Sequence, residues 1–221
     1  MIGEILPAAV VFAEAFADPP GVFLFPAEEA LLARATDKRR REFGTGRHCA
    51  RAALRALGLP AAPILPDDQG APRWPPGIVG SITHCDGYRA VAVARAPATV
   101  AIGIDAEPCQ SLAAEVLDLV SLPSERARLR ELAAAGPDVC WDRLLFSAKE
   151  AVYKAWFPLA RRWLGFTDAD ITIHPGGTFA ARLLVPGPAV GGAPLAGFDG
   201  RWLARDGLLL TAIALAAPSP G

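Results

Sequence analysis

The order in which helix-favouring and strand-favouring segments follow one another constrains the fold of this sequence most. Helices are expected over residues 26–34, 36–57, 112–120, 124–134 and 138–157. Strands are expected within residues 1–25 and over 88–94, 100–104, 171–173, 178–185, 201–204 and 208–214. The blocks therefore run strand, helices, strands, helices, strands, which favours an α+β fold with two similar halves over a regular βαβ repeat.

A proline-rich segment separates the first helices from the next strands. Its six prolines are Pro60, Pro63, Pro66, Pro72, Pro75 and Pro76. They predict a long loop over residues 60–79, with a turn at Asp67-Asp68-Gln69-Gly70. A loop this long inside a folded chain is often functional. In the helix before this loop, Gly44 and Gly46 weaken the helical pattern, so a break in the helix is an alternative to a continuous one.

Composition excludes several classes of protein. Of the 221 residues, 52% are hydrophobic and 20% charged, with a net charge of −1, which excludes intrinsic disorder and a globally basic nucleic-acid binder. The apolar N-terminal stretch is interrupted by Glu4 and Glu14, so no secretory signal is expected. The apolar run 208–217 is about half the ~20 residues of a membrane-spanning helix. We therefore expect a soluble cytoplasmic protein that binds neither nucleic acid nor membrane.

Two carboxylates follow an apolar strand in the segment Ala101-Ile-Gly-Ile-Asp-Ala-Glu107. Because side chains alternate along a strand, Asp105 and Glu107 project to the same side while Ala106 points away. Neighbouring carboxylates repel each other unless a cation lies between them, and oxygen ligands at a strand end suit Mg²⁺. The spacing alone leaves two surface acids at a solvated strand end as the alternative.

A third carboxylate lies in a helical segment, residues 141–156. The apolar positions follow helical spacing at 141, 144, 145, 148, 152 and 156. Glu150 and Lys154 are i,i+4 neighbours on one face, where they form either an ordinary surface ion pair or a metal ligand with a phosphate-binding ammonium. Lys149 is rotated off this face, so we assign it no catalytic role.

Two further segments suit phosphate. The basic run 38–41 is followed at helical spacing by Arg47, Arg51 and Arg55, and the guanidinium fork matches phosphate geometry. The segment Gly80-Ser-Ile-Thr-His84, just before a strand, offers small residues, hydroxyls and an imidazole. A solvated helix face and a structural histidine are the alternative interpretations.

Together these segments resemble the 4'-phosphopantetheinyl transferase family, in the large monomeric type that activates surfactin and enterobactin synthases. The matching segments, in the family's order and spacing, are Gly46-Arg-His-Cys-Ala-Arg51, Val79-Gly-Ser-Ile-Thr-His84, Gly103-Ile-Asp-Ala-Glu107 and Phe146-Ser-Ala-Lys-Glu-Ala-Val-Tyr-Lys-Ala-Trp156. The resemblance implies two similar α+β halves related by a pseudo-twofold axis, residues 1–100 and 101–221. A cleft for coenzyme A and Mg²⁺ is expected between them.

The resemblance also implies an activity. Such enzymes move the phosphopantetheine arm of coenzyme A to a serine of an acyl or peptidyl carrier protein and release adenosine 3',5'-bisphosphate. Asp105, Glu107 and Glu150 would hold Mg²⁺, or Mn²⁺ in its place, with the Ala106 backbone carbonyl or a water completing the octahedron. Glu150 would also be the general base that takes the proton of the serine, with Lys154 as the second catalytic group.

The coenzyme A contacts are implied in the same way. Lys154 and His84 would contact the pyrophosphate, and Arg39 and Arg47 the 3'-phosphate. The loop at 66–69 would contact the adenosine through its backbone, because this chain lacks the lysine that some relatives carry there. The residues expected to bind coenzyme A are Arg39, Arg47, Pro66, Asp67, Asp68, Gln69, Thr83, His84, Asp105, Glu150, Lys154 and, near the pantetheine arm, Leu164.

The expected partners are apo carrier proteins of fatty-acid, polyketide or nonribosomal-peptide synthesis. A monomer is expected, since two halves of one chain would form a complete cleft. Two alternatives stay open at this point. One is a non-catalytic relative of the same fold that binds coenzyme A or a carrier. The other is a different Mg²⁺-dependent phosphoryl-transfer enzyme or nuclease that uses the same carboxylates.

Overall fold

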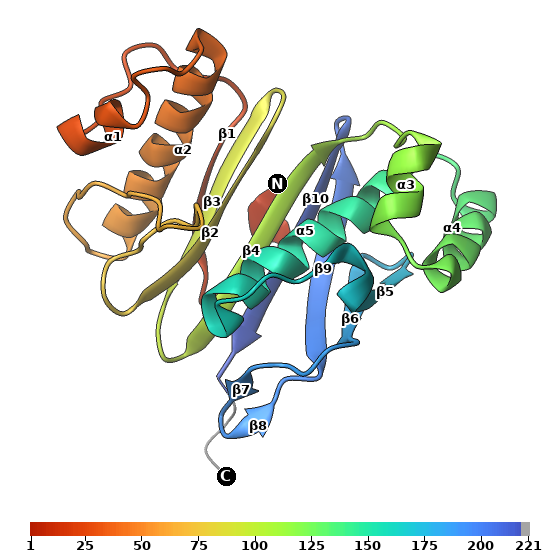
Figure 1. The fold of residues 1–221 in the computed structure, drawn as a ribbon. Coiled ribbons are helices and arrows are strands. Elements are labelled where there is room, and N and C mark those ends of the chain that lie inside the picture. The colour runs from red at the N-terminus through yellow and green to blue at the C-terminus, as the bar shows by residue number, and fades with distance from the viewer. Residues whose placement is uncertain (218–221) are drawn as a thin grey trace.

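Two antiparallel sheets lie beside each other in the computed structural model (Figure 1), which describes residues 1–217, so positions 218–221 of the predicted second half lie outside it. The first sheet has the strand order β1-β3-β2 and the second β4-β10-β9-β6-β5, with a separate two-stranded sheet β7-β8. Helices pack on both main sheets, so the predicted α+β class is confirmed.

The elements alternate in the blocks that the sequence predicts. The strands are β1 (Val11–Ala15), β2 (Ile78–Cys85), β3 (Tyr88–Arg95), β4 (Thr99–Pro108), β5 (Ala169–His174), β6 (Thr178–Leu183), β7 (Ala189–Val190), β8 (Ala193–Pro194), β9 (Gly197–Arg205) and β10 (Leu208–Ala216). The helices are α1 (Pro26–Ala30), α2 (Asp37–Ala56), α3 (Ala114–Val120), α4 (Pro123–Ala135) and α5 (Trp141–Ala160), with short 3₁₀ turns η1 (Ile2–Glu4) and η2 (Phe166–Asp168). Over residues 1–217, no helix combines the length and apolar character that crossing a bilayer requires.

In the first half, α2 packs against β1 and β3 over a small apolar core. The helix starts at its N-cap Thr36, whose hydroxyl accepts a hydrogen bond from the amide of Arg39. The helix is continuous through Gly44 and Gly46, so the alternative of a break at these glycines is wrong. A Cβ at either glycine would have its nearest neighbour at 3.7 Å, so close packing does not require these two glycines.

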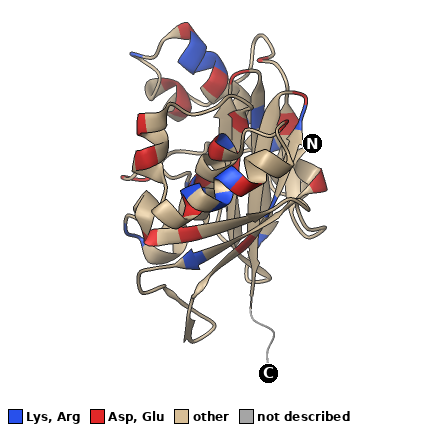
Figure 2. Ribbon diagram, turned by 90° about the vertical axis from the view of Figure 1, so that its right-hand side faces the viewer, with Lys and Arg blue, Asp and Glu red and all other residues tan. Residues whose placement is uncertain are grey.

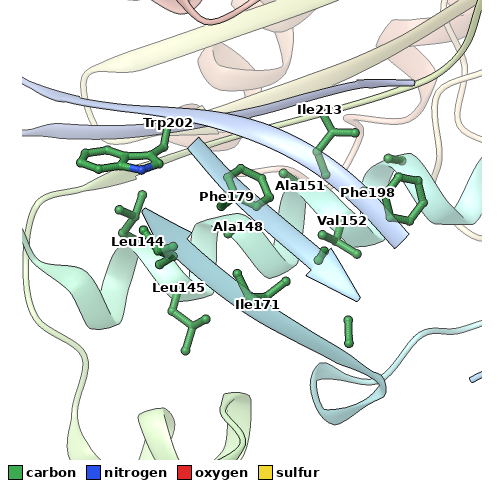
Figure 3. Close-up of a cluster of buried hydrophobic side chains, with 14 of the residues drawn as sticks. Leu144, Leu145, Ala148, Ala151, Val152, Ile171, Phe179, Phe198, Trp202 and Ile213 are labelled. Carbon is green, nitrogen blue, oxygen red and sulfur yellow. The ribbon is translucent and has the colours of Figure 1, made fainter. Parts of the chain in front are cut away.

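In the second half, α5 lies across the larger sheet. Figure 3 shows the apolar face of α5 directed at side chains from the strands. The labelled residues are Leu144, Leu145, Ala148, Ala151 and Val152 of α5 and Ile171, Phe179, Phe198, Trp202 and Ile213 of the sheet. The predicted helical spacing is thereby confirmed. At Gly103 the helix approaches β4 so closely that a Cβ would lie 1.9 Å from the carbonyl oxygen of Ala151.

A third apolar cluster joins the halves. Residues before position 100, such as Ile2 and Tyr88, pack with Ile102, Ile104 and Leu210 from the larger sheet, and none of these five is more than 1% exposed. The two halves therefore bury each other's surface. Their boundary at residue 100 and their pseudo-twofold relation stay predictions; the sheets themselves differ, with three and five strands.

The segment Gly80–His84 is part of strand β2, where the sequence predicted a loop before a strand. It pairs with β3 in an antiparallel hairpin. The residues are small and polar because β2 also lies against β4 of the other sheet. The hydroxyls of Ser81 and Thr83 accept hydrogen bonds from the amides of Ile104 and Ala106, at 3.1 and 3.0 Å. Gly80, Ser81 and His84 interrupt the branched residues of this strand, which obscures the pattern by which strands are usually identified.

Two helices begin at other residues than the sequence predicts. Helix α4 begins at Pro123, one residue before the predicted start at 124, because proline fits the first helical position and the Glu125 carboxylate accepts the amide of Leu122. Helix α5 begins at Trp141, three residues after the predicted start at 138. It also continues to Ala160, since Pro158 lies in the last turn and costs only one helical hydrogen bond there.

Candidate active site

A cavity of about 880 Å³ is lined by α2, the loop before β2, β2 itself, β4 and α5. Seven of the predicted site residues line it: Arg39, Arg47, Asp67, Gln69, His84, Glu150 and Lys154. The cations of the lining are Arg39, Arg47, Arg73, Lys154 and Arg161. Across the whole fold basic and acidic segments are intermixed (Figure 2), in keeping with the net charge of −1, so this gathering of cations is local. It suits a ligand with several phosphate charges.

Arg47 is held rigidly at the cavity wall. Its Nε donates to the carbonyl oxygen of Ile64 at 2.8 Å, and its guanidinium lies over the Phe43 ring at 4.1 Å from the centroid. Burial lowers the pKa of Arg47 to about 10, so the side chain stays charged at neutral pH. A fixed, charged fork of this kind is suited to a phosphate.

The other arginines of the predicted stripe do not line the cavity. Arg51 donates to the fully buried Glu28 at 3.0 Å, and Glu28 also accepts the amide of Ile64 at 3.0 Å. This pair fastens α1, α2 and the start of the long loop together, so Arg51 is structural. Arg55 is exposed in the last turn of α2. Only Arg47 of the three is therefore placed to meet a ligand.

His84 lies at the cavity wall beside Arg39. Its Nε2 is 3.3 Å from Nη1 of Arg39. Partial burial lowers the pKa of His84, and the positive charges of Arg39 and Lys154 lower it further, against the opposing carboxylate of Glu42. The imidazole is therefore neutral at neutral pH, and its Nε2 accepts from the guanidinium of Arg39.

Asp105 joins β4 to α5. Its Oδ1 accepts hydrogen bonds from Lys154 Nζ at 2.7 Å and from the Thr83 hydroxyl at 3.3 Å. Its Oδ2 is buried and has no hydrogen-bond partner. Thr83 is only 2% exposed, so it acts on Asp105 and does not line the cavity. A buried carboxylate oxygen without a partner is costly and marks a place that a cation would satisfy.

Glu107 and Glu150 are the neighbouring carboxylates. Burial and the charge of Asp105 raise the pKa of Glu107, although Arg143 opposes this with Nη1 at 3.1 Å. Burial also raises the pKa of Glu150; Lys154 opposes this and Asp105 adds to it. Within residues 1–217, no three acidic, histidine or cysteine side chains are gathered closely enough to form a ready-made metal site. The side chain of Ala106 is buried in the shared core, so this residue has only its carbonyl to offer.

The loop at 66–69 forms the predicted turn. Asp67 Oδ1 accepts the amides of Gln69 and Ala71, at 3.0 and 2.9 Å, and Oδ2 pairs with Arg161 at 3.0 Å. Asp68 is exposed and pairs with Arg73 at 3.3 Å, and neither it nor Pro66 lines the cavity. Asp67 thus ties the loop to the end of α5.

Leu164 lines a second, smaller cavity of about 80 Å³ beside Glu150. Its other walls include Tyr153, Trp163 and Phe166, which makes it largely apolar. Glu150, which the sequence predicts as the general base, and Tyr153 line both cavities.

Several residues at the site had no assignment from the sequence. Phe43 stacks on Arg47 from four positions earlier on α2, and helical spacing is the signal that indicates it. Arg143 lies seven positions before Glu150 and thus on the same face of α5, which is again a readable signal. Arg161 follows α5 in a left-handed conformation with φ of 51° and pairs with Asp67, and no local pattern indicates that contact.

Comparison with known proteins gives consistent matches. Residues 27–94 match the model of the 4'-phosphopantetheinyl transferase N-terminal domain, and residues 101–191 match that of the 4'-phosphopantetheinyl transferase superfamily. The chain is 57% identical over 223 residues to 4'-phosphopantetheinyl transferase Svp of Streptomyces mobaraensis, covering 99% of this chain and 91% of Svp. It is 54% identical over 225 residues to Npt of Nocardia iowensis (98% of this chain, 100% of Npt) and 51% identical over 225 residues to PptT of Mycobacterium tuberculosis (97% and 98%), both likewise 4'-phosphopantetheinyl transferases.

Proposed function

The chain belongs to the 4'-phosphopantetheinyl transferase family, and we propose how its site carries out the family's reaction. The protein transfers the phosphopantetheine arm of coenzyme A to a serine of a carrier protein and leaves adenosine 3',5'-bisphosphate. The observation that supports this assignment of the site is the 880 Å³ cavity, whose lining combines Glu150 and Lys154 with four arginines.

Glu150 takes the proton from the carrier serine. Glu150 lines both cavities, which supports a position between the phosphates and the pantetheine arm. Deprotonation lets the serine oxygen attack the β-phosphorus. The bond from that phosphorus to the bridging oxygen breaks, and the electron pair stays with the departing nucleotide.

The cations of the cavity bind the substrate's phosphates. Lys154, which lies against Asp105 at 2.7 Å, is next to the proposed base and meets the pyrophosphate together with His84. Arg39 and Arg47 project from α2 and take the 3'-phosphate. These contacts orient the substrate and offset its charge, which supplies most of the catalysis in phosphoryl transfer.

The carboxylates fit a divalent cation. Asp105 Oδ2 is buried without a hydrogen-bond partner, and burial raises the pKa of both neighbouring carboxylates. An all-oxygen set of this kind suits Mg²⁺, with Mn²⁺ as the alternative. Asp105, Glu107 and Glu150 would hold the ion, with the carbonyl of Ala106 or a water beside them. When bound, it would neutralise charge on the pyrophosphate oxygens.

The partners are acyl or peptidyl carrier proteins, and we expect a monomer acting in the cytoplasm. Residues from both halves line the cavity, which supports a complete site within one chain. Family membership favours this function over a nuclease that uses the same carboxylates.

A mass measurement tests the function. Purified protein is mixed with coenzyme A, Mg²⁺ and a panel of apo carrier proteins, and the molecular mass of each carrier is measured. The expected result is the added mass of one phosphopantetheine group on at least one carrier, lost when the acceptor serine is replaced by alanine. If coenzyme A binds but no carrier gains mass while a known transferase loads the same panel, the non-catalytic alternative is correct.

A further inference from the structure

Both carboxylates at the end of β4 are paired with a cation of α5. Asp105 accepts from Lys154 at 2.7 Å, and Glu107 from Arg143 at 3.1 Å. Arg143, Glu150 and Lys154 stand at i, i+7 and i+11 on α5, so all three project from one helix face. The proposed base therefore lies between the two cations, and each strand carboxylate is already neutralised in the structure.

The two ion pairs differ in what else the cation can reach. Lys154 lines the large cavity, so a phosphate can draw it away from Asp105. Arg143 is not part of that lining. Its Nε donates to the carbonyl oxygen of Gln110 at 2.9 Å, and the preceding residue, Asp142, accepts the amide of Leu112 at 2.8 Å. Arg143 is thus anchored to the segment that follows β4, whether or not Glu107 stays with it.

The pair is also shielded from water. The side chains of Arg143 and Glu107 are 21% and 19% exposed, so their attraction is screened less than that of a surface pair. In this arrangement the Glu107 carboxylate is engaged by Arg143, and no ready-made metal site is gathered among the described residues.

We propose that Arg143 is a positioning residue that holds Glu107 as an ion pair and competes with the divalent cation for that carboxylate. When the cation is present, Glu107 leaves Arg143, and the guanidinium stays on the carbonyl of Gln110. Arg143 therefore sets the concentration of free metal ion at which the site becomes occupied. The inference rests on the metal site of the proposed function.

Metal binding without turnover tests this inference. Free Mn²⁺ is measured by electron paramagnetic resonance in titrations of the metal-free protein, with no coenzyme A and no carrier. Arg143→Gln should bind Mn²⁺ about three- to tenfold more tightly than the parent, since Glu107 is released. The control Arg182→Gln, which removes an exposed arginine of β6 that pairs with Asp170 of β5, should leave the affinity unchanged.

A double-mutant cycle separates the release of Glu107 from a general loss of positive charge. In a Glu107→Gln background the competition is already gone, so adding Arg143→Gln should change Mn²⁺ affinity less than about twofold. Thermal unfolding of each metal-free variant shows that it is folded.

The outcomes are distinguishable. If the parent binds no Mn²⁺ at millimolar concentration, the metal site of the proposed function fails and the inference fails with it. If the parent binds Mn²⁺ but Arg143→Gln binds it equally or more weakly, the inference alone is overturned. The same holds if Arg143→Gln tightens binding as much without Glu107 as with it, because the effect is then general charge. Tightening that depends on Glu107 supports the inference.

Discussion

Replacing Gly103 by alanine should damage both stability and activity, because this position fixes the distance between β4 and α5. An added Cβ would lie 1.9 Å from the carbonyl oxygen of Ala151 and 2.8 Å from the amide nitrogen of Ala155. Both neighbours are backbone atoms of α5, so the clash is not relieved by a side-chain rotation. The helix as a whole has to move away from the strand.

The expected cost follows from overpacking. Inserting a methyl group into a close-packed core typically costs about 1–3 kcal/mol, and a clash with backbone belongs at the upper end of that range. Lower entropy of the unfolded chain returns about 0.4–1 kcal/mol. The net loss should therefore be about 2 kcal/mol, or a decrease in Tm of about 4–8 °C for a chain of this size. Activity should fall as well, since Asp105 lies on the strand and Glu150 on the helix.

Urea unfolding of the variant and the parent measures the effect, and the mass assay measures activity. The matched control is Gly44→Ala in the middle of α2, where the nearest neighbour of a new Cβ is at 3.7 Å. There alanine should stabilise the protein, because its helix propensity exceeds that of glycine by about 1 kcal/mol. If the free energy of unfolding of Gly103→Ala lies within about 0.5 kcal/mol of that of the parent, the close packing of α5 on β4 does not require glycine at this position.

Three further predictions address the site and the pH dependence of stability. Glu150→Gln should lower kcat about 10²–10⁴-fold, since it removes the proposed base, and activity comparable to the parent would refute that role. Lys154→Ala should lower kcat/KM at least about tenfold. The exposed Lys38, whose nearest acid is the exposed Asp86 at 3.3 Å, lies outside the cavity lining, so Lys38→Ala should change kcat/KM by less than about twofold; equal effects would contradict the assignment. Burial opposes the charged form of Glu14, but hydrogen bonds from the N-terminal ammonium, Tyr88 and the Ile2 amide lower its pKa overall. The ionised Glu14 therefore stabilises the folded protein above the unfolded pKa of about 4.3, and this stabilisation is lost as the pH falls through the folded pKa. In urea unfolding, the free energy of unfolding of Glu14→Gln should depend less on pH in this acidic range than that of the parent. An unchanged pH dependence would contradict the prediction.

Local patterns in the sequence predict much of the fold because they concern neighbours along the chain. The apolar spacing at 141, 144, 145, 148, 152 and 156 predicts the buried face of α5, and the structure confirms it. The alternation around Ala106 predicts that its side chain points away from those of Asp105 and Glu107. The structure adds that this side chain lies in the shared apolar core, where it is 1% exposed. The hairpin strand β2 was missed, because its small polar residues serve a contact with β4 that lies 23 residues away along the chain.

The arginines show where local patterns stop. Helical spacing places Arg47, Arg51 and Arg55 on one stripe, and all three are equally suited to phosphate by chemistry. Of the three, only Arg47 lines the cavity. Arg51 is held instead by an ion pair with Glu28, which lies 23 residues earlier in the chain and packs against α2. Lys149 is similar: it is buried in an ion pair with Glu125 at 2.9 Å, which no spacing rule indicates.

The sequence by itself therefore determined the α+β class and the family. It also indicated the candidate carboxylates, two positions apart at Asp105 and Glu107, and the pair Glu150 and Lys154, one helical turn apart. Periodicity sets the direction of a side chain on its own element, and the chemistry of the residue sets what it can bind. The tertiary structure alone decided which charges are free and which are paired. Arg143 with Glu107 and Glu28 with Arg51 are pairs between elements distant in sequence, and only packing brings such groups within reach of each other.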